Sequence, residues 1–319
     1  MFEVFVVYPW LFIGLTVALG LCVGSFSNVV IHRLPAAWDR ELTAGVVEWA
    51  DLAATQPDQA LARVPQAERA GLQPRLREMA DTLRTILKLM PQETLAKPRS
   101  RCPNCGHGIT AAENIPVFSF LALRGRCSGC KTPISPRYPL IEAFCGLVAG
   151  AIAWKFGVSL QYVAALVLFF WLVPLTMIDA DTTYLANSST LPLLWAGLAF
   201  NLFGVFAALS DAVLGAIVGY LFLAIPAWTY EALKRTGENA MGRGDFVLMA
   251  VLGAWFGWPA VLPIVLLSCC TGVAVSLPLM LSGKRDLLSK IPFGPYIAGA
   301  GVVYLFFGGV LKAWLGLLL

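Results

Sequence analysis

The sequence predicts an all-α polytopic membrane protein of about eight transmembrane helices, with a small zinc-ribbon-like module between the first two helices. Of the 319 residues, 58% are hydrophobic and only 13% are charged, and the mean hydropathy is +0.73. This composition is typical of membrane proteins. Apolar runs near the roughly 20 residues that span a bilayer recur along the chain, and one long polar segment, residues 32–137, interrupts them.

Eight apolar runs define the expected spans. They lie at about residues 9–31, 139–157, 160–178, 187–208, 211–231, 245–258, 259–281 and 291–314. The sixth run is short and rich in glycine, and Trp258-Pro259 joins it to the seventh, so counts of seven or nine spans also fit. Residues 1–7 contain Glu3 but no lysine or arginine. Because a signal peptide begins with a basic segment, we expect the first span to be retained.

The distribution of positive charge predicts the orientation. Residues 32–137 contain fifteen lysines and arginines. Only Lys155 and Lys312 fall on the opposite face when eight spans are threaded from this segment. Because loops that are rich in lysine and arginine stay in the cytoplasm, we expect residues 32–137 to be cytoplasmic and the N-terminus to lie outside. The other positive residues on the cytoplasmic face are Lys234, Arg235, Arg243, Lys284, Arg285 and Lys290.

The polar segment divides the chain into a first span at residues 1–31, a cytoplasmic domain at 32–137 and a membrane core at 138–319. Within the cytoplasmic domain, residues 74–90 predict an amphipathic helix, because apolar side chains recur there at steps of three and four. Pro74 suits the first turn of this helix, and Pro91 ends it. The helix is expected either to lie on anionic lipid headgroups or to pack on the zinc module or the helix bundle. No nucleic-acid-binding motif accompanies its positive charges, so we expect no nucleic-acid partner.

Four cysteines predict a structural zinc site at about residues 99–135. They form two C-x2-C pairs, Cys102 with Cys105 and Cys127 with Cys130, separated by twenty-one residues. This spacing is close to that of zinc ribbons, and four thiolates form a closed tetrahedral site with no open position for catalysis. Disulfides are the weaker interpretation, since the cytoplasm is reducing. The remaining cysteines lie in apolar runs and predict core packing: Cys22, Cys145, Cys269 and Cys270.

Two aspartates stand at the ends of apolar runs. Asp179 closes the run 162–178, and Asp245 opens the run 246–257. A carboxylate near the centre of a membrane helix costs about 2.5 kcal/mol or more unless something compensates for it. With the predicted topology both aspartates lie at cytoplasmic ends of their spans, where they can meet. Each aspartate alone is equally well explained as a helix-end residue in the headgroup region.

Two carboxylates held a few ångströms apart share one proton. One of them then activates water as a base, while the protonated partner polarises a carbonyl group and supplies a proton to the leaving amine. Gly242 and Gly244, just before Asp245, permit a close approach of a substrate strand. The rival interpretation is a transporter or channel with proton-coupling aspartates, which predicts inverted repeats that this sequence does not show.

Several short blocks occur in order along most of the chain, except at about residues 36–98. They are residues 24–35 (GSFSNVVIHRLP), 113–116 (ENIP), 124–127 (RGRC), 134–139 (ISPRYP), 178–181 (IDAD), 191–195 (LPLLW) and 242–246 (GRGDF). Together with the paired cysteines, these blocks resemble the type IV prepilin peptidases (leader peptidase/N-methyltransferases), a family of GxGD membrane aspartyl proteases.

The resemblance implies a bacterial inner-membrane enzyme that cuts the leader from type IV prepilins or type II secretion pseudopilins at the cytoplasmic face of the membrane. It places the catalytic dyad on Asp179 and Asp245, with Asp181 as a nearby carboxylate and Gly242 and Gly244 in the active-site loop. It also implies N-methylation of the new N-terminus with S-adenosylmethionine as the methyl donor.

The residues themselves give no sign of the methyltransferase, because no glycine-rich Rossmann fingerprint is present. Asn28, Arg33 and Glu142 are candidates for it only because they lie in the family-like blocks. Roles in loop structure or topology explain these three residues equally well.

The chain departs from the family pattern at two places. Residues 184–187 (YLAN) replace the usual Leu-Leu-Pro-Asp, and Ala240 and Val247 replace a usual glycine and lysine around the GxGD block. Both catalytic aspartates are kept. The departures leave room for a third interpretation, an inactive pilus or secretion assembly factor that has kept the fold.

Overall fold

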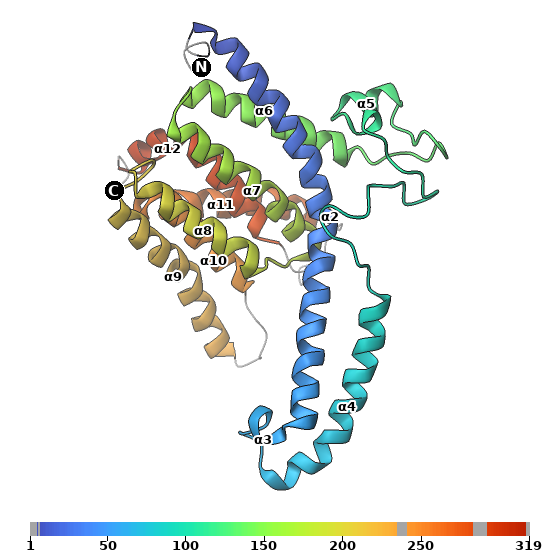
Figure 1. Ribbon diagram of the computed structural model, residues 1–319. Coiled ribbons are helices and arrows are strands. Elements are labelled where there is room, and N and C mark those ends of the chain that lie inside the picture. The colour runs from blue at the N-terminus through green and yellow to red at the C-terminus, as the bar shows by residue number, and fades with distance from the viewer. Residues whose placement is uncertain (1–4, 6, 235–240, 283–291, 317–319) are drawn as a thin grey trace. The chain divides into compact units, whose positions relative to one another are not determined.

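The computed structural model describes residues 5, 7–234, 241–282 and 292–316, and across these residues it is built from helices (Figure 1). The described residues contain no β-strand, only two isolated β-bridges. The chain forms two compact units: residues 1–28 with 110–319, and residues 29–109. The predicted all-α class is confirmed. Six residues on which predictions rest lie outside the described part of the chain: Glu3, Arg235, Ala240, Lys284, Arg285 and Lys290.

A helix occupies each of the eight predicted spans, but by length and composition only six helices in the described residues can cross a membrane. The two others are α8 (Asn187–Asn201) and α10 (Arg243–Phe256), with 15 and 14 residues. At 1.5 Å per residue they are about 21–23 Å long, less than the roughly 30 Å of hydrocarbon. The six longer helices are α2 (Pro9–Thr55), α6 (Arg137–Phe156), α7 (Leu160–Thr182), α9 (Leu209–Lys234), η2 with α11 (Trp258–Ala260 and Val261–Leu281) and α12 (Gly294–Gly316).

Helix α8 is shorter than predicted because Asn201 ends it and turns the chain. The Asn201 side-chain amide donates to the carbonyl oxygens of Ala254 and Trp255 at 2.8 and 2.9 Å. Its side-chain oxygen accepts hydrogen bonds from the backbone amides of Phe206 and Ala207 at 3.0 and 3.1 Å. The turn after α8 is thereby fixed to the last turn of α10.

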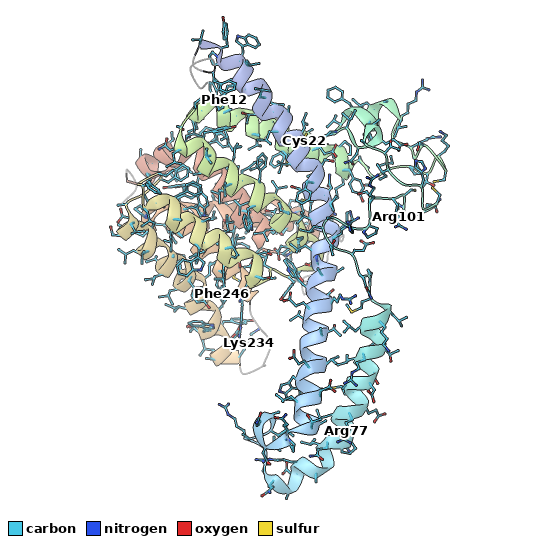
Figure 2. The ribbon with its side chains drawn as sticks, viewed as in Figure 1. Phe12, Cys22, Arg77, Arg101, Lys234 and Phe246 are labelled. Atoms are coloured by element: carbon cyan, nitrogen blue, oxygen red, sulfur yellow. The ribbon has the colours of Figure 1, made fainter. Side chains whose placement is uncertain are left out.

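Helix α10 is the core of the larger unit. It is buried from Asp245 to Phe256 apart from the half-buried Val247, and it packs against α8, α9 and α12 (Figure 1). A helix that is apolar on all sides belongs in a core, so its neighbours, and not lipid, cover it. Gly215 of α9 and Gly253 of α10 let the two backbones touch, as small residues do between membrane helices. In the first turn of α10, the Phe246 ring packs against Tyr220 of α9 (Figure 2).

The first helix does not end at residue 31 as predicted, but continues through Pro35 to Thr55. The second unit is built from this extension, the short helix α3 (Pro57–Ala60) and helix α4 (Gln66–Leu89). Arg84 of α4 binds Asp51 of α2 at 2.5 Å, and Ala50 and Ala80 are completely buried. The amphipathic helix therefore packs on the extension of the first helix.

Helix α4 starts at Gln66, eight residues before the predicted start, so that Pro74 lies inside it. The apolar periodicity begins only at Leu72, which is why the sequence indicated the later start. Arg69 holds the first turn in place through hydrogen bonds to the Val64 carbonyl oxygen at 2.8 Å and the Asp58 carboxylate at 2.7 Å.

Candidate active site

Asp179 lies in the last turn of α7 and is 4% exposed. Ser159 is the N-cap of helix α7, and its hydroxyl accepts a hydrogen bond from the Tyr162 amide at 3.1 Å. The helix ends at Thr182, and the next residue, Thr183, takes a left-handed conformation with φ 53°. The Thr183 amide donates to the Asp179 carbonyl oxygen, so the aspartate belongs to the closing turn of the helix.

Asp245 lies in the first turn of α10 and is 7% exposed. Gly242 caps this helix, and a Cβ atom placed on it would lie 3.1 Å from the Asp245 Oδ2 atom. A Cβ atom on Gly244 would lie 2.6 Å from Leu185 Cβ, a distance that no side chain tolerates. The glycines of the GxGD block thus let the start of α10 approach the segment that follows α7. Asp245 and Asp179 lie close enough to interact electrostatically.

Helix α12 brings a third element to this place. The Gly294 amide donates a hydrogen bond to Asp179 Oδ2 at 3.0 Å in a buried environment. Gly294 was not among the predicted site residues. The available signal was the glycine followed by Pro295 at the start of the last apolar run, but this pattern also occurs at ordinary helix starts.

Asp181, which was ranked as a nearby carboxylate, has a partner of its own. Arg137, the first residue of α6, donates to both carboxylate oxygens of Asp181, at 2.9 and 2.6 Å. The two side chains are 36% and 42% exposed. The structure therefore places Asp179, Asp245 and Gly294 together and gives Asp181 a separate, more exposed ion pair.

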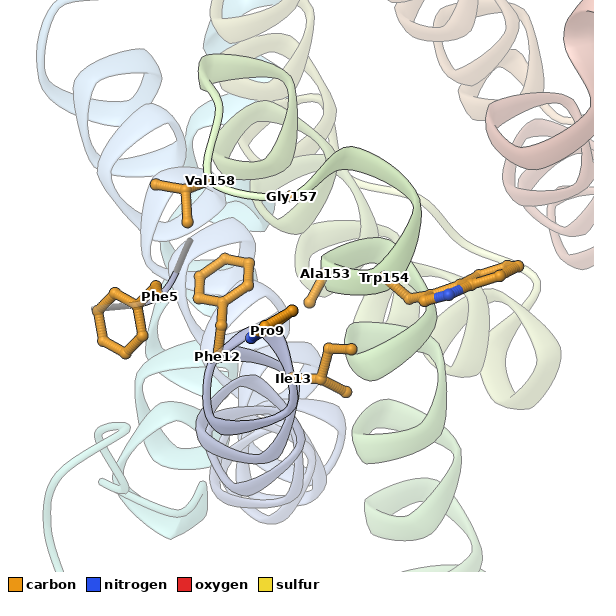
Figure 3. Close-up of a pocket in the computed structure, with 8 residues that line it drawn as sticks. All are labelled: Phe5, Pro9, Phe12, Ile13, Ala153, Trp154, Gly157 and Val158. Atoms are coloured by element: carbon orange, nitrogen blue, oxygen red, sulfur yellow. The ribbon is translucent and has the colours of Figure 1, made fainter. Parts of the chain in front are cut away.

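An apolar cavity of about 280 Å³ lies at the opposite end of α7, beside the short connection between α6 and α7 (Figure 3). None of its lining residues carries a titratable side chain, so the cavity offers no acid–base chemistry. The lining residues are Phe5, Pro9, Phe12, Ile13, Ala153, Trp154, Gly157 and Val158.

The sulfur atoms of Cys102, Cys105, Cys127 and Cys130 all lie within 4.8 Å of one another. Tetrahedral zinc with Zn–S bonds of about 2.3 Å needs sulfur atoms about 3.8 Å apart, so this donor set fits zinc. Both cysteine pairs form the same tight turn, in which the amide four residues after the first cysteine donates to its carbonyl oxygen. These amides belong to Gly106 and Lys131, which have φ values of 74° and 61°.

The three candidates for the methyltransferase are engaged in hydrogen bonds within the protein. Asn28 donates to the Tyr138 carbonyl oxygen at 3.3 Å, and Glu142 accepts from the Val117 amide at 2.7 Å. Arg33 donates to carbonyl oxygens of residues 94 and 98 at 2.8 and 2.7 Å. These bonds account for the three side chains without a cofactor.

Two protein families match the chain. Residues 18–156 match the Bacterial Peptidase A24 N-terminal domain, which covers the four cysteines, and residues 166–277 match the Type IV leader peptidase family, which covers both aspartates. No solved structure matches the chain.

Several similar proteins are named prepilin leader peptidase/N-methyltransferase. The protein from Stutzerimonas stutzeri is 43% identical over 96% of this chain and 94% of its own length. The proteins from Aeromonas hydrophila and Pseudomonas aeruginosa are 42% and 40% identical, over 96% and 94% of this chain and 94% and 92% of their own lengths. The resemblance noted in the sequence blocks is confirmed, and the chain belongs to the type IV leader peptidase family.

Proposed function

We propose that this chain is an aspartic endopeptidase that removes the leader peptide from type IV prepilins. The convergence of Asp179 and Asp245 at the buried ends of α7 and α10 is the observation that carries the proposal. The names of the similar proteins supply the substrate class. Family membership supports a peptidase and not a transporter or an inactive assembly factor.

The chemistry follows from two buried carboxylates side by side. Such a pair holds one proton between its members, since two adjacent charges are costly to bury. The ionised member takes a proton from water, and the protonated member donates to the oxygen of the scissile carbonyl. In a buried site, fixed protein dipoles replace the water around the two carboxylates. The hydrogen bonds that these carboxylates form with the attacking water and the carbonyl oxygen are therefore stronger in the transition state.

We further propose that type II secretion pseudopilins are also substrates and that cleavage occurs at the cytoplasmic face of a bacterial inner membrane. The positive charge of residues 32–137 supports this orientation. The exposed apolar residues of the spanning helices, such as Leu147 and Phe307, fit contact with lipid.

Two cofactors belong to the proposal. Zinc held by Cys102, Cys105, Cys127 and Cys130 would cross-link the two cysteine turns and has a structural role. The names of the similar proteins support N-methylation of the mature pilin, for which S-adenosylmethionine supplies the methyl group. We assign no methyl-transfer step to Asn28, Arg33 or Glu142, because these side chains are used within the fold.

The test is cleavage of a purified prepilin by the purified protein with S-adenosylmethionine supplied, read on a gel and by intact mass. Asp179→Asn and Asp245→Asn keep the size of the side chain but remove the ionisable group. Each should lower cleavage by about 10³-fold or more, because a dyad acts as a unit. Both variants should still insert into the membrane and bind zinc. Cleavage retained in either variant would exclude the dyad, whereas a product without an added methyl group would exclude only the methyltransferase.

A further inference from the structure

The first amide of α12 has an unusual partner. The first N–H groups of a helix have no partner within it and are satisfied by caps or water. In α12, the amides of Tyr296 and Ile297 donate to the Phe293 carbonyl oxygen at 3.1 and 3.2 Å. The Gly294 amide instead donates to Asp179 Oδ2, on a helix 115 residues earlier in the chain. The carboxylate that is proposed to do chemistry therefore also caps another helix.

Any side chain at position 294 would force the Asp179 carboxylate to move. A Cβ atom there would lie 2.5 Å from Asp179 Oδ2 and 3.3 Å from Leu185 Cδ1. Leu185 also packs directly against Gly244, just before Asp245. The same leucine thus separates the starts of α10 and α12 and sets their distance from the end of α7. This close packing leaves Asp179 Oδ2 facing the Gly294 amide.

The two aspartates differ in the hydrogen bonds that their carboxylates accept. Within the described residues, the Asp245 carboxylate accepts no hydrogen bond of the kind that Gly294 donates to Asp179. The dipole of α10 favours a negative charge on Asp245, and the dipole of α12 favours one on Asp179, although the negative end of the α7 dipole opposes a charge there. The hydrogen bond from Gly294 is the contact that favours the charge on Asp179 over Asp245, since a donor that faces a carboxylate stabilises its charged form.

We propose that Gly294 is a positioning residue whose amide makes Asp179 the ionised member of the dyad, so that Asp179 is the base and Asp245 is the acid. The inference rests on the proposed peptidase function. Asp179 takes a proton from water as the new oxygen–carbon bond forms, and Asp245 gives its proton to the carbonyl oxygen. When the carbon–nitrogen bond breaks, Asp179 protonates the amine and Asp245 recovers a proton from the gem-diol.

The first test removes only the hydrogen bond. Glycolic acid placed at position 294 by cell-free translation replaces the Gly294 N–H by an ester oxygen without adding a Cβ atom. We expect kcat for prepilin cleavage to fall about 10- to 100-fold with KM unchanged, the loss of one hydrogen bond to a charged group. The matched control is the same ester at Gly299, which removes a bond inside α12 at a position with nothing within 4 Å of its Cβ. Lower thermal stability with kcat unchanged would mean that the bond only caps α12, and would overturn the proposal.

The second test asks which aspartate carries the proton, and it does not require cleavage. Infrared spectra of the enzyme with ¹³C-labelled aspartate carboxyl groups separate the protonated carbonyl stretch from the carboxylate bands. The protonated band should be present in the wild type and in Asp179→Asn, and absent in Asp245→Asn. The reverse pattern, or no protonated band in the wild type, would overturn the assignment. If the wild type shows the expected band but cleaves no prepilin, the peptidase function fails and not the assignment.

Discussion

Asp181 shows how two carboxylates two residues apart can have separate roles. Arg137 holds both oxygens of Asp181 in a bidentate pair, whereas Asp179 faces Gly294 and Asp245. Because both side chains of the pair are more than a third exposed, water screens it, and we expect it to stabilise the fold by no more than about 1 kcal/mol. A carboxylate that is paired in this way is poorly suited to replace either aspartate of the proposed dyad.

We therefore predict that Asp181→Asn keeps substantial cleavage, within a few-fold of the wild type, since an exposed ion pair contributes little. Initial rates on a purified prepilin measure it. Asp51→Asn is a matched control, because Asp51 forms a comparable exposed pair with Arg84 at 2.5 Å in the other unit. If Asp181→Asn were as inactive as Asp179→Asn, the dyad would have been assigned to the wrong aspartate.

The sequence was sufficient to find the two aspartates, because a charged residue at the end of an apolar run stands out in one dimension. Gly294 could not be found in this way. Its role depends on the approach of α12 to the end of α7, and a glycine before a proline has many ordinary uses. Leu185 is a similar case, because an apolar residue in a short connection does not reveal that two glycines pack against it.

At the level of elements, the polar segment at residues 32–137 was the least predictable. The first helix continues to Thr55 because the polar residues after the apolar run include few helix breakers, and Pro35 does not stop it. Hydropathy marks where a membrane span ends, and not where a helix ends. The extension pairs with α4 through small residues, among which Ala50 and Ala80 are completely buried. Small side chains at the contact allow two helices to lie close together.

Replacing one of these alanines with a larger residue should push α4 away from the extension of α2. We predict that Ala80→Leu destabilises the second unit by about 1–3 kcal/mol, the usual cost of overpacking. Ala70→Leu on the exposed side of α4 is the control and should be nearly neutral. Limited proteolysis of the second unit at increasing urea concentrations compares the two variants. Equal stabilities would show that the buried contact at Ala80 is not tightly packed.

The cysteine turns give a second prediction at this level. One zinc ion should bind per chain, and Cys102→Ser should reduce the bound metal and loosen the two turns, since a closed tetrahedral site needs all four thiolates. Metal analysis together with limited proteolysis measures both effects. Cys22→Ser, which changes a cysteine outside the cluster, is the control. Less than half an equivalent of zinc in the wild-type protein would contradict the prediction.

For the whole molecule, the contacts at the dyad fix which helix ends share a face. Asp179 lies in the last turn of α7, α10 begins beside Asp245 and α12 begins at Gly294. The ion pair to Asp181 adds the start of α6 to this face. Four helix ends thus meet at one face, although α8 and α10 are too short to span a bilayer alone. The opposite ends carry Lys155, which donates to the Leu305 carbonyl oxygen at 2.9 Å.

This arrangement leads to a test of membrane topology, in which cysteines at two positions should be labelled from opposite sides of the membrane. Helix α6 separates the polar segment from the turn at Val158, so Lys97 and Val158 should lie on different sides of the membrane. Because positively charged segments stay inside, Lys97→Cys should react with a membrane-impermeant maleimide only in inverted vesicles. Val158→Cys, 41% exposed at the other end of α6, should react only in intact cells with a permeable outer membrane. Both variants need a background in which Cys22, Cys145, Cys269 and Cys270 are replaced, so that only the zinc ligands remain. Labelling of Lys97→Cys in intact cells would place the dyad on the outer face, where a leader on the cytoplasmic side could not reach it.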